Sequence, residues 1–166
     1  MPYFLDGTIA GLPEPRKPGR PGFFQRTFRR GQPSFCTPSV HLFGWLDHRM
    51  PYSFGPIGPE ALSVLEKAVV AGHVWGMRGF HHCRMCPTSS PGPTRYNAAT
   101  RKYYLGSASL IVTDVDGNPW VAPNFVLHYV TVHGYAPPIR VYDAPPGLIA
   151  SIRSKGCPDI VMQNLI

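Results

Sequence analysis

The chain has 166 residues, which is the length of one ordinary domain with a core of its own. Hydrophobic residues make up 43% of it and charged residues only 15%, and 20 Pro and 17 Gly predict long irregular connections. No apolar run reaches the roughly 18 residues that a membrane span needs, and the first residues lack the order of a signal peptide. These features predict a cytoplasmic protein without a membrane span, in which four Cys fit metal binding better than disulfides.

The net charge of +7 is concentrated in one segment. Between Pro15 and Trp45 there is no acidic residue, whereas the rest of the chain carries nearly equal numbers of acidic and basic groups. We therefore expect a Pro-, Gly- and Arg-rich basic arm at residues 1–38 and a nearly neutral domain at residues 39–166. The basic residues of the arm, which we expect to contact nucleic acid or an acidic protein, are Arg16, Lys17, Arg20, Arg26, Arg29 and Arg30.

The arm has two interpretations. Residues 16–21, RKPGRP, resemble the core of an AT-hook, in which a Gly-Arg-Pro tripeptide lies in the minor groove of DNA. The basic residues that usually flank this tripeptide are replaced by Pro18 and Gly22. A solvated arm with a general affinity for phosphate is therefore the favoured interpretation.

In the first half of the domain, the sequence predicts one helix between two strands. Residues 40–46, VHLFGWL, are short, apolar and aromatic, as a buried strand is. Residues 59–72 predict a helix, because Pro59 suits a first turn, Glu60 lies at the positive end of the helix dipole, and a glycine ends the pattern. Residues 73–80 then predict a strand that leads directly into the two closest cysteines.

The second half predicts a hairpin followed by two helices. Residues 109–113 and 120–122 are apolar and flank DVDGN at 114–118, where Asp-Gly is a hairpin turn signal. Residues 123–134 contain many β-branched and aromatic residues, which favours a strand, but a proline at the start and a glycine at the end favour the helix that we expect. A last short helix is expected at residues 146–155. Together these elements predict an α+β domain with a small mixed sheet and two or three helices.

A candidate metal site begins with Cys83 and Cys86, spaced Cys-x-x-Cys at the end of a predicted strand. Such a pair forms a knuckle, in which both thiolates point at one zinc ion about 2.3 Å away. Zinc takes four ligands, and His128 and His133 have a spacing common in structural zinc sites. On a helix with a loosened last turn both rings reach one metal, whereas on a strand they lie roughly 17 Å apart. His81 is a fifth candidate, as a ligand or as a neighbour of the ligands, because it faces the same side as Cys83.

The order of knuckle, hairpin and helix resembles a treble-clef zinc finger. A thioredoxin-like redox pair is disfavoured, because the Pro-rich segment after Cys86 cannot continue as the helix that such a pair needs. A zinc deaminase is disfavoured, because its His-x-Glu motif is missing. No carboxylate lies near the knuckle in sequence, so we assign no catalytic residue. The enzyme class that stays open is a metal-dependent nuclease with His81 or His82 as the base.

A longer pattern resembles a family of short, uncharacterised bacterial proteins. The pattern is Phe80-His81-x-Cys83-x-x-Cys86 followed by Leu127-His128-Tyr129-x-x-x-His133-Gly134-Tyr135-x-Pro137-Pro138. The resemblance covers about residues 40–155 and leaves the basic arm outside. It implies a shared metal-site pattern and no particular reaction.

The function predicted from the sequence is that of a non-catalytic binding module stabilised by zinc. Its partner would be nucleic acid or an acidic protein surface, contacted through the basic arm. The alternative is a metal-dependent nuclease, or another hydrolase, that works at the same ion. Whether the protein is an enzyme is left open by the sequence.

Overall fold

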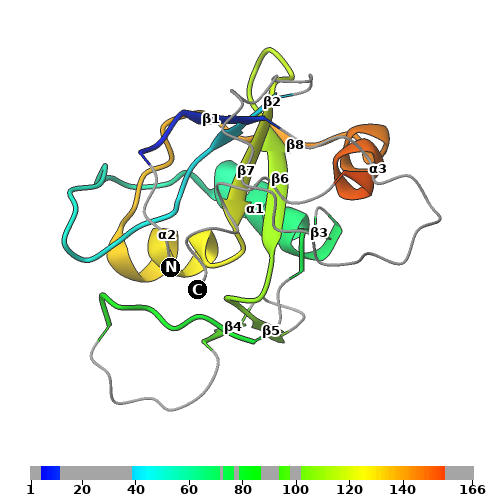
Figure 1. The fold of residues 1–166 in the computed structure, drawn as a ribbon. Coiled ribbons are helices and arrows are strands. Elements are labelled where there is room, and N and C mark those ends of the chain that lie inside the picture. Colours follow the sequence, from blue (N-terminus) through cyan, green and yellow to red (C-terminus); the bar gives the residue numbers. More distant parts are fainter. Residues whose placement is uncertain are drawn as a thin grey trace, which may run out of the picture.

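The computed structural model describes residues 5–11, 39–71, 73–76, 79–86, 94–97 and 102–155. These residues form an α+β fold with a mixed sheet and helices, as the sequence predicts (Figure 1). None of the helices in these ranges is both long and apolar enough to cross a membrane. In chain order the elements are β1 Thr8–Gly11, β2 Ser39–Leu42, α1 Pro59–Ala71, β3 His73–Val74, β4 Arg95–Asn97, β5 Lys102–Tyr104, β6 Ser109–Thr113, β7 Pro119–Pro123, α2 Val126–His133, β8 Tyr142–Asp143 and α3 Pro146–Ser154.

The main sheet has the strand order β1-β2-β7-β6-β3, and β8 also pairs with β6. Because β7 occupies one edge of β6 along its whole length, β3 and β8 share the other edge. The β2–β7 pair is parallel and all other pairs are antiparallel. The β6–β7 hairpin is the predicted one, and its turn is closed by the carboxylate of Asp114, which accepts hydrogen bonds from the backbone N–H groups of Asp116 and Asn118.

Both faces of the sheet are covered, so strand β6, which pairs with β7, β3 and β8, is buried throughout. Leu110 and Val112 point to the side that α1 and α2 cover, whereas Ile111 between them points to the side of α3, where it meets Ile149 and Ile152. This alternation follows from the two-residue period of a strand. Figure 1 shows α2 and α3 at opposite sides of the sheet. The domain therefore has two cores, one on each face of the sheet.

Three predicted elements have different bounds in the structure. The predicted strand at 40–46 ends earlier, at Leu42, which pairs with Thr8, the first residue of the antiparallel partner strand β1. The predicted strand at 73–80 is reduced to His73–Val74, because the next residue, Trp75, has a φ of +45°, which lies outside the strand region. The predicted helix at 123–134 begins only at Val126, because Pro123 still pairs with Ser109 as the last residue of β7.

The first residues of the predicted arm belong to the sheet. Strand β1 pairs with β2, and just before it the carboxylate of Asp6 accepts hydrogen bonds from the N–H of Gly44 and the hydroxyl of Tyr135. Residues 12–38 lie outside the described residues, and with them lie all six basic residues predicted to contact nucleic acid or an acidic protein.

Candidate metal centre

Four side chains from two distant segments converge on one point: Cys83, Cys86, His128 and His133. Their four donor atoms all lie within 4.8 Å of one another. The Sγ of Cys86 is 3.3 Å from the Nε2 of His128 and from that of His133, the Sγ of Cys83 is 3.3 Å from the Nε2 of His133, and the two Nε2 atoms are 3.2 Å apart. Donors in a zinc tetrahedron, with bonds of about 2.3 Å to sulfur and 2.0 Å to nitrogen, lie roughly 3.3–3.8 Å apart. This Cys2His2 cluster therefore has the composition and the size that a tetrahedral metal ion requires.

The two histidines meet because the last turn of α2 is widened. The N–H of Gly134 bonds to the carbonyl of Tyr129, five residues back instead of the four of an α-helix. Gly134 itself has a φ of +64°, a left-handed conformation that a side chain disfavours. As a result the rings of His128 and His133 lie in contact, with their centroids 4.9 Å apart. The loosened last turn predicted from the sequence is confirmed.

A loop between β2 and α1 fixes this end of α2. The hydroxyl of Tyr52 donates to the carbonyl of His133 at 3.2 Å, and the N–H of Gly55 donates to the carbonyl of Gly134 at 3.0 Å. The ring of Phe54 lies so close to Gly134 that a Cβ on this glycine would collide with it. The loop therefore determines where the ring of His133 lies.

The knuckle, residues 83–86, turns so that two of its backbone N–H groups face the Sγ of Cys83. The N–H of Met85 donates to the Sγ of Cys83 at 3.4 Å, and the N–H of Cys86 approaches the same sulfur. Burial raises the pKa of the Cys83 thiol, and these two backbone donors act in the opposite direction because they favour the thiolate. A thiolate is the form that binds metal, so the backbone of the knuckle supports the metal-binding form.

The two histidines are neutral at physiological pH. Burial, and after it the neighbouring His133, lower the pKa of His128 to about 4. Burial also lowers the pKa of His133. Neutral imidazoles have a free lone pair on one ring nitrogen, which is the form that ligates metals.

A chain of hydrogen bonds, two between backbone groups and one to the side chain of Asn124, joins the knuckle segment to α2. The N–H of His81 donates to the carbonyl of Gly106 at 2.9 Å, and the N–H of Gly106 donates to the side-chain Oδ1 of Asn124 at 2.7 Å. Asn124 is buried two residues before α2 begins, and its own N–H donates to the carbonyl of Ala108 at 2.8 Å. Thus the two cysteines and the two histidines are attached to the same end of β6.

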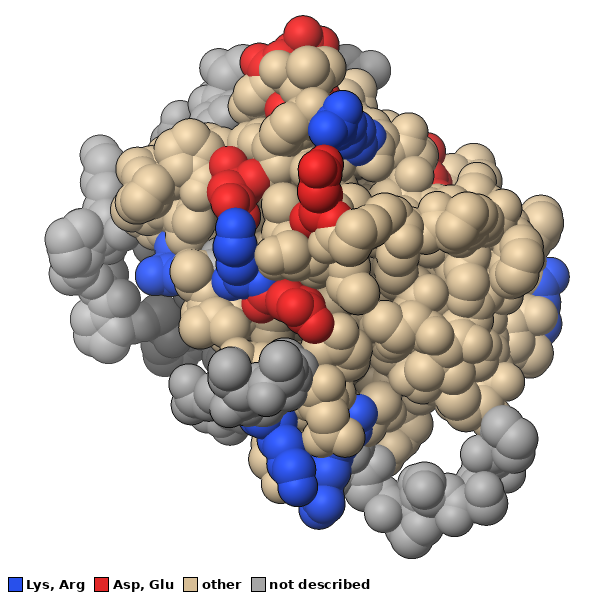
Figure 2. All heavy atoms as spheres, turned by 180° about the vertical axis from the view of Figure 1, so that it is seen from behind, with Lys and Arg blue, Asp and Glu red and all other residues tan. Residues whose placement is uncertain are grey.

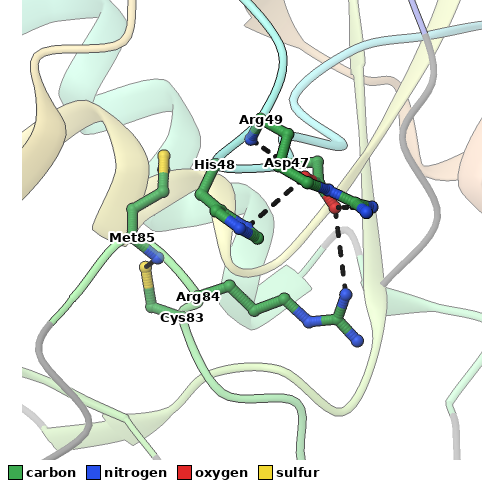
Figure 3. A network of polar contacts seen from close by, with 6 residues as sticks. All are labelled: Asp47, His48, Arg49, Cys83, Arg84 and Met85. Carbon is green, nitrogen blue, oxygen red and sulfur yellow. Dashed lines mark hydrogen bonds and ion pairs between the residues drawn. The ribbon is translucent and has the colours of Figure 1, made fainter.

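A buried carboxylate contacts Arg84, one of the two residues between the cysteines (Figure 3). Asp47 binds Arg49 at 2.9 Å, lies 3.4 Å from the ring of His48, and reaches Arg84 of the knuckle at 3.9 Å. The hydrogen bonds from Arg49 hold the pKa of this carboxyl well below its usual range. Sequence inspection missed Asp47, because the two partners that reveal its role are a local arginine and an arginine far along the chain.

The structure brings together four of the five residues proposed as ligands. In the described part of the chain this is the one group of three or more such side chains with metal-binding geometry, and His81 is not a member of it. His82 is exposed beside the knuckle. The two remaining cysteines, Cys36 and Cys157, lie outside the described residues.

Comparison with known proteins identifies a family. Residues 26–145 match the family described as "Domain of unknown function (DUF7919)", so the chain belongs to this family. None of the curated proteins and none of the solved structures gave a significant match. We expected the family resemblance to begin near residue 40. The match begins at residue 26, inside the basic arm, and therefore includes Arg26, Arg29 and Arg30.

Proposed function

We propose that the Cys2His2 cluster holds one structural zinc ion and that the domain is a non-catalytic binding module. The observation that carries this proposal is the convergence of two sulfurs and two imidazole nitrogens at the separations of a tetrahedral site. Zinc is the metal that most often uses such a mixed sulfur and nitrogen donor set in a tetrahedral arrangement. Bound there, it would link the knuckle to α2 and contribute folding free energy on the order of 10 kcal/mol.

A structural role is favoured over a catalytic one by the number of protein ligands. Catalytic zinc usually keeps one position open for water or substrate, and four protein donors fill a tetrahedron. The carboxylate that contacts the knuckle, Asp47, is paired with Arg49 and Arg84, and the hydrogen bonds from Arg49 lower its pKa and keep it ionised. An acid held in this way is a poor general base, since it has little tendency to take a proton.

The partner of the module is proposed to be nucleic acid or an acidic protein surface, contacted by the basic arm. Support comes from the six basic residues of residues 16–30, which no acidic residue offsets within the segment. The family match includes half of these six.

The competing proposal, a metal-dependent nuclease or another hydrolase at the same ion, rests on His82, which is exposed directly beside Cys83. Incubating plasmid DNA and RNA with the protein and a divalent metal separates the two. Cleavage that disappears in His81→Ala or His82→Ala would support the enzyme, whereas binding without cleavage supports the module.

The metal content of the purified protein tests the zinc proposal. We expect one zinc per chain by elemental analysis, and a cobalt-substituted protein should show the intense visible bands of a tetrahedral thiolate site. Cys83→Ser should lose the metal and become unfolded or insoluble, because zinc-dependent domains do not fold without the ion. The matched control is Cys36→Ser, a cysteine that is not one of the four proposed ligands, which should keep both metal and solubility. A metal content below about half an ion per chain would contradict the proposal.

A further inference from the structure

A small two-stranded ribbon, β4 and β5, stands apart from the main sheet between the knuckle and β6. A pair of such short strands is not stable alone, so the domain must hold it in place. Tyr96 and Tyr103, a cross-strand pair, turn inward and pack against the core that α1 and α2 cover. The hydroxyl of Tyr96 donates to Glu66 of α1 at 2.6 Å. The inner face of the ribbon is thus fully occupied.

The outer face of the ribbon consists of the alternate positions, which form the cross-strand pairs Arg95–Tyr104 and Asn97–Lys102. All four residues are exposed, and Tyr104 is 52% exposed. The guanidinium carbon of Arg95 lies 5.7 Å from the centre of that ring. Phe80, 46% exposed, lies beside it with ring centroids 6.1 Å apart. The outer face is therefore a continuous row of aromatic and basic groups.

The basic groups of this row lack acidic partners in the described part of the chain. Elsewhere Arg140 pairs with Glu60 and Lys67 pairs with Asp143, whereas no ion pair joins Arg95 or Lys102 to a described residue. Glu66, which accepts the hydrogen bond from Tyr96, lies on the inner side of the ribbon. Figure 2 shows acidic and basic side chains in contact over the upper half of the face, and basic side chains alone at its lower edge, at the height where Figure 1 places β4 and β5.

Exposed aromatic rings next to unpaired cations suit a ligand with flat apolar faces and negative charges. Unpaired bases stack on such rings, and the backbone phosphates between them bind arginine and lysine. Double-stranded nucleic acid hides its base faces and would use the charges alone. An acidic protein would also use the charges, but it would leave the two rings without a matching surface.

We propose that the outer face of the ribbon, extended by Phe80, binds single-stranded nucleic acid. Bases stack on Tyr104 and Phe80. Phosphates bind Arg95 and Lys102, and Asn97 is placed to bond to a base edge. Phe80 directly precedes His81, whose N–H bonds to Gly106, so the same contact that positions the knuckle places Phe80 against Tyr104. This inference names a partner for the binding module proposed above and rests on that function.

The test measures affinity of the full chain for fluorescent oligo(U) and oligo(dT) of about 12 nucleotides, within the usual range of site sizes. A duplex of equal length is the comparison. Both single strands should bind more tightly than the duplex at equal salt. Tyr104→Ala should weaken single-strand binding at least about fivefold, the loss expected for one stacked base, and Tyr104→Phe should retain it. Arg95→Gln should make the negative slope of log affinity against log salt shallower by about 0.7, the value for one phosphate contact with a single strand.

The chain contains a matched control pair. Arg140 lies over the ring of Tyr142 with its guanidinium carbon 5.6 Å from the ring centre, but it is offset by Glu60 and lies away from the ribbon. Arg140→Gln and Tyr142→Ala should bind as the unaltered protein does. The ribbon variants should show the same losses in a background where the six basic residues of the arm are changed to Gln, since these losses are assigned to contacts that the ribbon residues themselves make.

Several results would overturn the inference: no binding of either single strand, equal affinity for the duplex, unchanged binding by Tyr104→Ala, or an equal loss in Tyr142→Ala. Competition by polyglutamate as effective as that by oligo(U) would show an acidic-protein site instead. Stronger binding of oligo(U) than of oligo(dT) would add a contact to the 2′-hydroxyl and supports the inference. If the protein contains zinc but the ribbon variants bind single strands normally, only the ribbon proposal is refuted. If the protein contains no zinc but the ribbon variants bind single strands weakly, only the zinc proposal is refuted.

Discussion

At the scale of single residues, Gly106 supports the metal site because it lies in close contact with the segment that carries the knuckle. Its φ is +98°, and a Cβ there would stand 2.5 Å from the carbonyl oxygen of His81 and 3.1 Å from the ring of Phe125. The missing side chain allows the knuckle segment to lie directly on the backbone before β6. Both neighbours are fixed, since one is backbone and the other is a fully buried ring.

We predict that Gly106→Ala lowers the free energy of unfolding by at least about 2 kcal/mol, because it combines a strained φ with a collision against backbone. It should also weaken zinc retention in a competition with a chelator, since the knuckle is displaced from α2. The matched control is Gly117→Ala in the β6–β7 turn, where φ is +81° but no atom lies near the added Cβ. Equal losses in the two variants, measured by urea unfolding, would show that the contact with His81 is unimportant.

At the scale of elements, the β6–β7 hairpin is the frame that carries α2 to the knuckle. Its turn is organised by Asp114, which also accepts a hydrogen bond from the indole of Trp120 at 3.0 Å and one from the side-chain amide of Asn118. Burial acts to raise the pKa of Asp114, but the hydrogen bonds from Asn118, Trp120 and Asp116 outweigh it and lower the pKa to about 2. The ionised carboxylate is thus favoured by the folded state.

We predict that the stabilisation by Asp114 is present above its unfolded pKa, near 3.8, and is lost as the pH falls towards about 2. The sign follows because the unfolded chain takes up this proton first, which favours unfolding in acid. Comparing Asp114→Asn with the unaltered protein at each pH isolates this group from metal loss, which affects both proteins. The difference in free energy of unfolding should be largest above pH 4 and shrink below it. A difference that does not depend on pH would contradict the assigned hydrogen bonds.

At the scale of the whole molecule, the first residues of the predicted arm are part of the folded domain. Strand β1 completes one edge of the sheet, and Ala10 is fully buried in the core on the α3 side. Asp6 bonds to the hydroxyl of the fully buried Tyr135, two residues after the metal-site residue His133. The charge of the arm and the stability of the domain are therefore carried by different parts of residues 1–38.

We predict that deletion of residues 1–38 lowers the free energy of unfolding by about 3 kcal/mol or more, because it removes a paired strand and the partly buried carboxylate of Asp6, which accepts two hydrogen bonds. Changing the six basic arm residues to Gln should leave the stability unchanged and reduce only the affinity for nucleic acid and its dependence on salt. Thermal and urea unfolding measure the stability of both variants against that of the full chain. A deletion variant as stable as the full chain would mean that β1 contributes little.

Much of the local structure followed from the sequence. The helix at Pro59, the hairpin at Asp114 and the short helix at Pro146 were all predicted, because a proline at a first turn, an Asp-Gly turn and a hydrophobic period act within a few residues. The spacing of Cys83 and Cys86 is equally local. Together with the spacing of His128 and His133, it predicted which side chains would form the metal site.

Tertiary structure decided the rest, because each remaining feature depends on residues far apart in the chain. Strand ends at Leu42 and Val74 were set by the length of a partner strand and by one residue with a positive φ. The pairing of Asp47 with Arg84 and the contact of Gly106 with His81 join segments that no short sequence window contains. The choice between strand and helix for residues 126–133 depends on both the local sequence and the tertiary packing. Its composition favours a strand, but packing against α1 and the core makes it the helix that brings His128 to His133.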